Sequence, residues 1–415
     1  MDYIIGLLMP MAIFLDPSSP VLLAKSSLAQ GGVAFPLSFF VLPLALTISL
    51  FRIGGGINKR YAPLVFFGAP FLIYTILLSL VIGISGQAAA LVYGAQWAFV
   101  FLWLPYFLAL KREEQFSALY EGFLNGAFFS VLYYSVSGVL EIAIYGSLMD
   151  MGRMTQNLIL PGQYQVAVYV PTLIAFSAGL INGLFLSGRV KKSMRWLLAF
   201  NFMTVLSLIF LAAREAILVY VLSLGLFYAV RKPSRFIVSI GLVVFLGGAL
   251  FLNIDGIFAA MSGSEVRAFQ KFASLQYEEN RLGGRDVMIK NVLTIVESDP
   301  LFGSHFLPPD SVGRELGVYA PSAHNMYIDA LVWTGGIGGA LFWIFCASLF
   351  FYSLCIVLKN YRSPGVVGVS VYSSVLVLML LIVSNNLNVP MRQPIVAPLF
   401  ALLIVLIFKK EQVDK

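Results

Sequence analysis

The chain contains two histidines, His305 and His324, and both lie in the last third of the sequence. Histidine is the side chain best suited to exchange a proton near neutral pH, so either one is a candidate general base. A histidine at the edge of an apolar segment can equally be an interfacial polar residue without a catalytic role. His324 is followed directly by Asn325 and then by a long apolar run, which makes it the stronger candidate for chemistry.

The elements that must position these residues are membrane helices. Of the 415 residues, 59% are hydrophobic and 11% are charged, whereas a soluble domain carries roughly 25% charged residues. The mean hydropathy of +0.88 therefore predicts an integral membrane protein. Residues 1–14 lack the basic start and small-residue cleavage site of a signal peptide, so we expect them to stay in the mature protein.

Hydropathy predicts an all-α integral membrane protein with about twelve transmembrane helices, because a span needs about 20 apolar residues. The predicted spans are 3–24, 34–53, 62–85, 88–110, 121–146, 166–186, 196–213, 215–230, 236–253, 325–357, 365–385 and 394–408. With both termini in the cytoplasm, the short loops on that side are basic, as the positive-inside rule requires. The positive-inside rule then explains the net charge of +7, because the basic residues set the orientation of the chain in the membrane. We therefore expect no nucleic-acid partner.

One predicted outer loop is much longer than the others. Residues 254–323 are hydrophilic and separate about nine predicted helices in 1–253 from about three in 324–415. Apolar residues recur at helical spacing over 266–275 and again over 286–297, which predicts amphipathic helices inside this loop. Long loops are usually functional or disordered, and this periodicity favours a functional loop.

The sequence that begins at His324 carries a family resemblance. His324-Asn325 is followed after nine residues by Gly335 and after two more by Gly338. This spacing resembles the signature of the O-antigen ligase and O-antigen polymerase superfamily of membrane glycosyltransferases. The resemblance covers roughly residues 196–400.

Two upstream motifs resemble the same family. Residues 284–286 (Gly-Arg-Asp) are followed by 299–303 (Asp-Pro-Leu-Phe-Gly), and 213–215 (Ala-Arg-Glu) lie at the outer end of a predicted span. In the family, one arginine opens a loop helix that ends in a Pro-Leu-hydrophobic-Gly turn, and another arginine lies on a helix before the loop. The family often has Ser before and Gly after the latter arginine, where this chain has Ala213 and Glu215.

The resemblance implies a metal-independent, inverting glycosyltransferase with a GT-C-like fold and no cofactor. Such enzymes take a glycan from undecaprenyl diphosphate. Ligases pass it to the lipid A core, and polymerases pass it to another lipid-linked glycan. The resemblance also implies a multi-pass protein of the bacterial inner membrane, in contact with membrane lipids, whose active site faces the periplasm. A regulator of chain length would be a further partner. The His-Asn spacing slightly favours the ligase.

The implied reaction assigns roles to the charged residues. A diphosphate leaving group concentrates negative charge, and the planar guanidinium of arginine matches phosphate oxygens. We therefore expect Arg214 and Arg285 to stabilise the leaving group, while His324 acts as the base for the acceptor hydroxyl. Further candidates for substrate binding are Arg281, Asn325, Arg153 and Arg392.

Each of these residues also has a simpler interpretation. Arg214 can extend its side chain to the membrane interface, and Arg285 can lie on a solvated helix face. Asn325 can cap the helix that follows it. Gly335 and Gly338 can allow neighbouring helices to approach closely.

Two other functional classes stay open at this point. A transporter or flippase of lipid-linked saccharide would place ionisable residues near the bilayer midplane and would show repeated halves. Glu141 is the clearest charge within a predicted span, and no half-repeat is evident. A non-catalytic scaffold would explain the hydrophobicity, but it gives no reason for both histidines to lie together near the long outer segment.

Overall fold

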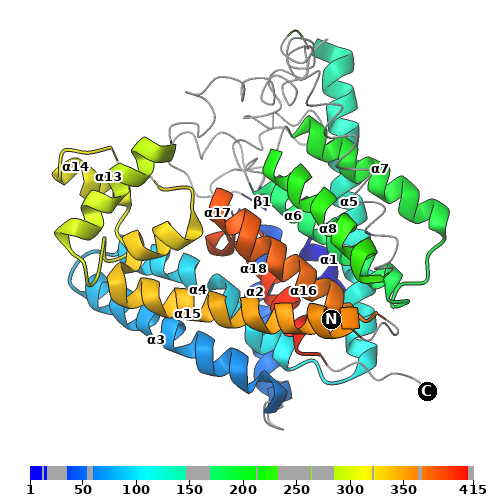
Figure 1. The fold of residues 1–415 in the computed structure, drawn as a ribbon, viewed down its shortest axis with the longest axis horizontal. Helices are drawn as coiled ribbons and strands as arrows, with labels where there is room; N and C mark the ends of the chain where they lie inside the picture. Colours follow the sequence, from blue (N-terminus) through cyan, green and yellow to red (C-terminus); the bar gives the residue numbers. More distant parts are fainter. Residues whose placement is uncertain are drawn as a thin grey trace.

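The computed structural model describes residues 1–11, 14–15, 35–53, 59–145, 169–211, 214–231, 263, 285–319, 322–362 and 367–409. Within these residues the chain is a bundle of helices (Figure 1). The one departure from the predicted all-α fold is a pair of two-residue antiparallel strands, β1 (Phe14–Leu15) and β2 (Phe35–Pro36).

The helices follow one another up and down through the bundle. In the first half they are α1 (Asp2–Leu8), α2 (Leu37–Ile53), α3 (Ala62–Ile84), α4 (Ala89–Leu108), α5 (Glu113–Tyr145), α6 (Val170–Leu186), α7 (Met194–Phe210) and α8 (Arg214–Arg231). In the second half they are α13 (Arg285–Ser298), α14 (Pro309–Glu315), α15 (Met326–Arg362), α16 (Val369–Met379), α17 (Asn385–Leu387) and α18 (Ala397–Ile407). A π-helical segment, Leu380–Ser384, joins α16 to α17, and a 3-10 helix, Pro390–Arg392, precedes α18.

Five of the described helical runs are long and apolar enough to cross a membrane. They are α3, α4, α5 as far as Leu140, α15 as far as Asn360, and the continuous run Val369–Leu387. Four shorter apolar helices accompany them, namely α6, α7, α18 and the Phe40–Arg52 part of α2. The multi-pass character is therefore confirmed, while the number of about twelve spans stays a prediction. The predicted span 236–253 lies outside the described residues.

The first predicted span differs most from the structure. We expected residues 3–24 to form one helix, but α1 ends at Leu8 and a turn follows at Met9 and Pro10. Proline lacks a backbone donor and disrupts the preceding turn, so it is a poor residue for continuing a helix. The short α1 packs closely on α5, where a Cβ on Gly122 would lie 2.0 Å from the carbonyl oxygen of Tyr3.

The most deeply buried helices are α6, α16 and α18, and Figure 1 shows α16 and α18 at the centre of the bundle. Every residue of α18 is buried. A helix that is apolar on all sides is stable only in a core or in lipid, and these short helices lie in the core. The outer helix α3 presents much more of its apolar surface outward.

Charged residues mark one end of the bundle. There Arg52 Nη1 lies 2.8 Å from Asp2 Oδ1, and Lys409 Nζ lies 3.2 Å from Glu113 Oε2. Arg189 contacts the same glutamate. These contacts join α2 to α1, and α5 to the ends of α6 and α18, and they involve the loops that the sequence places in the cytoplasm.

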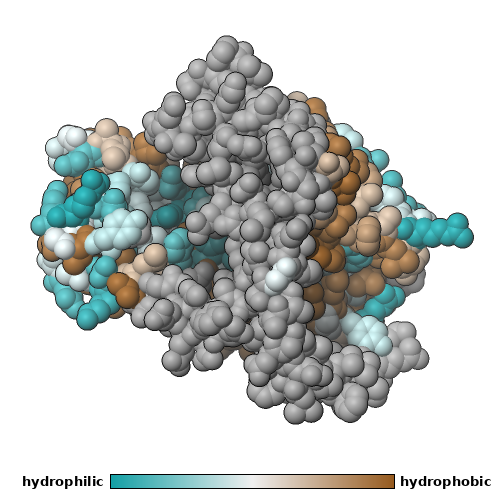
Figure 2. Space-filling model, turned by 90° about the horizontal axis from the view of Figure 1, so that it is seen from above, coloured by the Kyte–Doolittle hydropathy of each residue, from teal (hydrophilic) through white to brown (hydrophobic). Residues whose placement is uncertain are grey.

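The opposite end of the bundle carries α13, α14 and the beginning of α15, at the left of Figure 1. Figure 2 shows hydrophilic side chains around that end, a hydrophobic surface further along the molecule, and hydrophilic side chains again at the far end. His324 and Asn325 precede α15 directly, so they lie at the end away from the basic loops.

Candidate functional site

The site begins at Asn325, the residue directly before α15. The side-chain Oδ1 of Asn325 accepts hydrogen bonds from the backbone N–H groups of Tyr327, at 3.0 Å, and Ile328, at 3.2 Å. These contacts confirm that Asn325 caps the helix. The same side chain also donates through Nδ2 to the carbonyl oxygen of Asn386, at 3.4 Å, and to its side-chain Oδ1, at 3.3 Å. Asn325 therefore fixes the start of α15 and joins it to the segment around α17.

His324 lies in a backbone conformation that few side chains adopt. Its φ is 50°, in the left-handed region. The His324 N–H donates to Ser322 Oγ at 3.1 Å. The short segment 322–325 before α15, here called the strap, therefore holds this conformation. A constrained backbone at a candidate catalytic residue is a common feature of functional sites.

Asp329 is a charged residue of this site that sequence reasoning missed. It lies in the first turn of α15 and is completely buried. Its carboxylate accepts hydrogen bonds from Ser322 Oγ, at 2.7 Å, and from the N–H of Ala323, at 2.8 Å. Arg392 Nη1 lies 3.8 Å from Asp329 Oδ2. A fully buried charge requires such partners.

Arg392, a predicted substrate-binding residue, lies in the same cluster. Its guanidinium carbon is 4.7 Å from the ring centre of Trp333 and 5.9 Å from that of Trp97. Its side chain is 12% exposed. The buried Nε and Nη1 atoms have no hydrogen-bond acceptor among the residues that the structure describes. The guanidinium of Arg392 thus lies near two aromatic rings, and its Nε–H and Nη1–H groups can donate to a ligand.

The beginning of α8 reaches the same cluster. Asn388 Nδ2 lies 3.4 Å from Glu215 Oε2, so the segment that contacts Asn325 also contacts α8. Tyr169, the residue before α6, lies close to these charges. The charges of Arg392, Asp329 and Glu215 all act on its phenol. The helix that opens at Arg214 is therefore part of the site.

The other predicted residues are described only in part. Helix α8 begins at Arg214 and α13 begins at Arg285, and the side chains of both lie outside the described part of the chain. Arg281 and Arg153 lie wholly outside it. The predicted loop helix over 286–297 is confirmed as α13, which contacts α15. The amphipathic helix predicted over 266–275 also lies outside the described residues.

Gly335 breaks α15, and the segment that approaches it closely is a turn and not a neighbouring helix. The close helix–helix approach is found at Gly338, where a Cβ would lie 2.5 Å from the ring of Tyr74 on α3. The φ of Gly335 is 65° and its ψ is −169°, so the helix is kinked there. The turn after α13 occupies the break. The N–H of Ser304 donates to the carbonyl of Val332 at 2.7 Å, and the N–H of Gly336 donates to the carbonyl of Pro300, also at 2.7 Å. The Pro-Leu-Phe-Gly turn and the glycine motif are therefore one packed unit.

The second histidine belongs to that turn. His305 Nε2 lies 2.8 Å from Asp299 Oδ2, and the N–H of Phe302 donates to Asp299 Oδ1 at 3.0 Å. Burial raises the pKa of Asp299, but the bonds from Phe302 and His305 outweigh that effect and hold the pKa below its usual range. His305 thus has a structural partner within its own turn.

Several site residues were missed because they lie in or next to apolar segments. Glu215 and Asp329 lie near the start of predicted spans, and Asn386 and Asn388 follow directly after another. The sequence offered one signal for them. A polar residue inside a membrane segment carries a free-energy cost, so it usually serves a function or pairs with another polar residue. Three asparagines within residues 385–388 were the clearest such signal.

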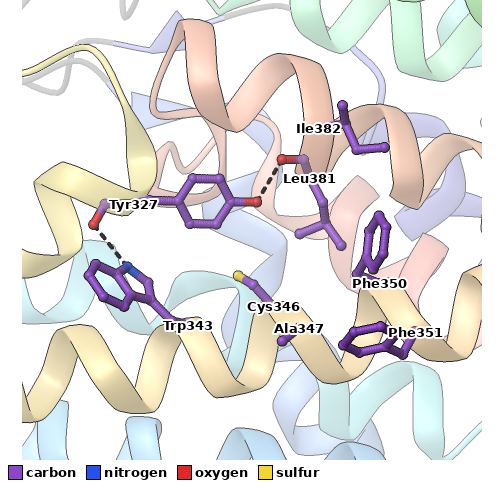
Figure 3. Close-up of a pocket in the computed structure, with 8 residues that line it drawn as sticks. All are labelled: Tyr327, Trp343, Cys346, Ala347, Phe350, Phe351, Leu381 and Ile382. Atoms are coloured by element: carbon purple, nitrogen blue, oxygen red, sulfur yellow. Dashed lines mark hydrogen bonds between the residues drawn. The ribbon is translucent and has the colours of Figure 1, made fainter.

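An apolar groove runs along α15 beside the site (Figure 3). Its volume is about 320 Å³, and it is lined by Tyr327, Trp343, Cys346, Ala347, Phe350, Phe351, Leu381 and Ile382. The hydroxyl of Tyr327 donates to the carbonyl of Leu381 at 2.6 Å, across the groove from α15 to the π-helical segment. Because Tyr327 is two residues from Asn325, the groove begins next to the polar cluster.

Metal ligation has no evident support within the described ranges, where no group of three or more His, Cys, Asp or Glu side chains could hold an ion. The polar residues gathered at the start of α15 are instead a histidine, an arginine, two carboxylates and several asparagines. Such a set can move a proton and hold an anionic or hydroxyl-rich ligand by hydrogen bonds.

Comparison with known proteins gives one family. Residues 198–343 match the model of a family described as O-antigen ligase. The matched region includes α8, α13, the strap before α15 and the glycine kink, which confirms the resemblance to the O-antigen ligase and polymerase superfamily. Arg392 and the asparagines of residues 385–388 lie beyond it. No curated protein matches the chain.

Proposed function

We propose, from the match of residues 198–343 to the O-antigen ligase family, that this chain moves a glycan from undecaprenyl diphosphate to a sugar hydroxyl. The transfer takes place at the periplasmic face of the bacterial inner membrane. The enzyme is an inverting, metal-independent glycosyltransferase that needs no cofactor.

The observation that carries the proposal is the convergence of helix beginnings. His324 precedes α15, Arg214 opens α8, and a single segment around residues 386–388 contacts both helices. Arg392 lies in the same cluster. The positive ends of helix dipoles favour anions, and arginines bind phosphate oxygens, so this end of the bundle suits a diphosphate.

The chemistry follows from these groups. His324 accepts the proton of the acceptor hydroxyl as its oxygen attacks the anomeric carbon from the face opposite the diphosphate. A new glycosidic C–O bond forms, the bond from the anomeric carbon to the diphosphate oxygen breaks, and the diphosphate leaves with the electron pair. Arg214 and Arg285 stabilise the negative charge that develops on it. The anomeric configuration is inverted because attack and departure occur on opposite faces.

The remaining arginines bind the substrate. Arg392 has buried donors without an acceptor among the described residues, so it suits a phosphate or sugar oxygen. We assign Arg281 and Arg153 to the same role from their predicted position on the outer side. Asn325 caps α15 and donates to Asn386, so it supports the site by fixing the start of the helix next to His324.

A lipid-linked donor fits the surroundings of the site. Its polyprenyl chain must remain in the bilayer while the diphosphate reaches the polar cluster. The apolar groove that begins at Tyr327 runs from the cluster along the outside of α15 (Figure 3). The apolar lining accepts a hydrocarbon chain because no polar group of the groove loses a partner when the chain lies there.

The orientation rests on charge. The end that carries Arg52, Arg189 and Lys409 is the basic end, and short basic loops face the cytoplasm. The end that carries His324 then faces the periplasm. The acceptor is the lipid A core or another lipid-linked glycan, and the His-Asn spacing slightly favours the former, with a chain-length regulator as a partner if polymers form.

The experiment is a transfer assay with purified protein in lipid. Undecaprenyl-diphosphate-linked repeat units are supplied with and without lipid A core, and products are separated on a gel. A shifted core band that requires the core establishes a ligase, whereas a ladder formed without core establishes a polymerase. No product from folded protein with a competent donor contradicts the transferase and favours transport of the lipid-linked saccharide.

A further inference from the structure

Asp329 is the carboxylate most completely removed from solvent in the candidate site. It is 0% exposed, in the first turn of a helix long enough to cross a membrane. A buried charge in such a helix is expensive and persists only with defined partners. Helix capping does not explain it, because Asn325 already accepts from the N–H groups of Tyr327 and Ile328.

One branch of its contacts leads to His324. Asp329 Oδ1 accepts from the N–H of Ala323 at 2.8 Å, and Asp329 Oδ2 accepts from Ser322 Oγ at 2.7 Å. Ser322 Oγ in turn accepts from the N–H of His324 at 3.1 Å. The carboxylate therefore holds the strap that keeps His324 in its left-handed conformation, with φ at 50°.

The other branch leads to Arg392. Its Nη1 lies 3.8 Å from Asp329 Oδ2, too far for a hydrogen bond and close enough for a strong charge interaction in a buried setting. Trp333, one turn along the same helix from Asp329, lies under the guanidinium at 4.7 Å. Charge and ring together fix Arg392 while leaving its donors at Nε and Nη1 without a protein acceptor among the described residues.

We propose that Asp329 is a positioning residue that places His324 and Arg392 relative to each other for the transfer reaction. The proposal rests on the proposed function and adds a residue to it. Asp329 does not act on substrate, because its carboxylate is inaccessible and occupied by Ser322 and Ala323. It acts through the backbone of the strap on one side and through charge on the other.

Two substitutions test the contacts of Asp329 toward His324 and toward Arg392 separately. Ser322→Ala removes the contact to the His324 N–H and leaves the charge of Asp329 in place. Asp329→Asn removes the charge that faces Arg392, keeps an oxygen for the Ala323 N–H, and still allows a hydrogen bond with Ser322. Asp310→Asn is the control, since Asp310 lies on α14 in a partly exposed pair with Arg314.

The test compares kcat and donor KM for these variants, each corrected for folded protein by thermal unfolding in detergent. We expect Ser322→Ala to lower kcat by about 10-fold to 100-fold with little change in KM, because small misplacements of a base are costly. We expect Asp329→Asn to lower kcat too and, in addition, to raise the donor KM several-fold. Both parameters should stay unchanged in Asp310→Asn. Equal kcat and KM in all folded variants would overturn the proposal, and would assign Asp329 a purely structural role.

A second readout does not depend on catalysis. In a His305→Gln background, His324 is the remaining histidine of the chain. Its rate of reaction with diethyl pyrocarbonate then measures how accessible and how reactive its imidazole is. We expect Ser322→Ala to change that rate several-fold and Asp310→Asn to leave it unaltered. If the wild-type protein shows no transfer, a changed rate still supports the positioning while the proposed function fails. An unchanged rate overturns the positioning itself.

Discussion

Gly303 and Gly335 meet backbone to backbone. A Cβ on Gly303 would lie 2.7 Å from the amide nitrogen of Gly335, and a Cβ on Gly335 would lie 2.1 Å from the carbonyl oxygen of Leu301. Both glycines have positive φ, at 63° and 65°. No other residue type fits both the space and the conformation. The turn after α13 and the break in α15 therefore depend on each other.

Substituting either glycine should destabilise the fold strongly. We expect Gly335→Ala to lower the free energy of unfolding by at least about 3 kcal/mol, from about 1–3 for a φ of 65° with a ψ of −169°, which is essentially confined to glycine, and the rest for the clash. Gly317→Ala is the matched control, because Gly317 has a φ of 74° with open space around it. It should show only the backbone cost. Denaturant unfolding in detergent measures both, and equal losses would mean that the contact between the turn and α15 is not tight.

Tyr74 completes the kink from a neighbouring helix. Its hydroxyl donates to the carbonyl of Thr334 at 2.7 Å, directly before the break, where the helical pattern ends. We expect Tyr74→Phe to lower stability by about 1–2 kcal/mol, because a largely buried carbonyl loses its donor. Tyr228→Phe, at a side chain that is 40% exposed, should change stability by much less. A similar loss in both variants would show that the hydroxyl of Tyr74 is not needed at the kink.

The turn should respond to acid through Asp299. Since contacts with Phe302 and His305 hold its pKa below the usual value of about 4, the carboxylate stabilises the fold at neutral pH. That stabilisation is lost as the pH falls through the lowered pKa. We expect Asp299→Asn to unfold at lower temperature than the wild type near neutral pH, with the gap closing in acid. Parallel melting curves across the pH range would contradict this assignment.

Arg392 should be sensitive to the shape of its side chain as well as to its charge. We expect Arg392→Lys to keep the charge opposite Asp329 but to lose the stacking on Trp333 and the planar donor set. The donor KM should rise about 10-fold, a difference of about 1.4 kcal/mol in binding. Arg314→Lys, at a side chain that is 73% exposed, is the control and should leave KM unchanged. A wild-type KM in Arg392→Lys would reduce its role to charge alone.

Much of the helical framework follows from sequence patterns. The predicted loop helix over 286–297 corresponds to α13 at Arg285–Ser298, because its apolar residues recur at helical spacing. The capping role of Asn325 was one of two interpretations, and the structure confirms it while adding the contact to Asn386. Local patterns succeed where the determinants are within a few residues.

The rest depends on contacts between distant residues. Gly335 breaks α15 because a turn nearly thirty residues upstream supplies hydrogen bonds to Val332 and Trp333, which no local pattern reveals. Asp329 resembles any acidic residue in the first turn of a helix, where it is favoured by the helix dipole. Its importance appears only when Arg392, on another element, lies 3.8 Å away.

The central claim is that His324 acts as the base, and the two histidines of the chain allow a direct comparison. The measurement is kcat for glycan transfer from the undecaprenyl-diphosphate donor in His324→Ala and His305→Ala, each corrected for folded protein. We expect a loss of at least about 100-fold for His324→Ala, the usual contribution of a general base. We expect near wild-type kcat for His305→Ala, because the partner of His305 is Asp299. Substantial transfer by folded His324→Ala would contradict the role of His324 as the base.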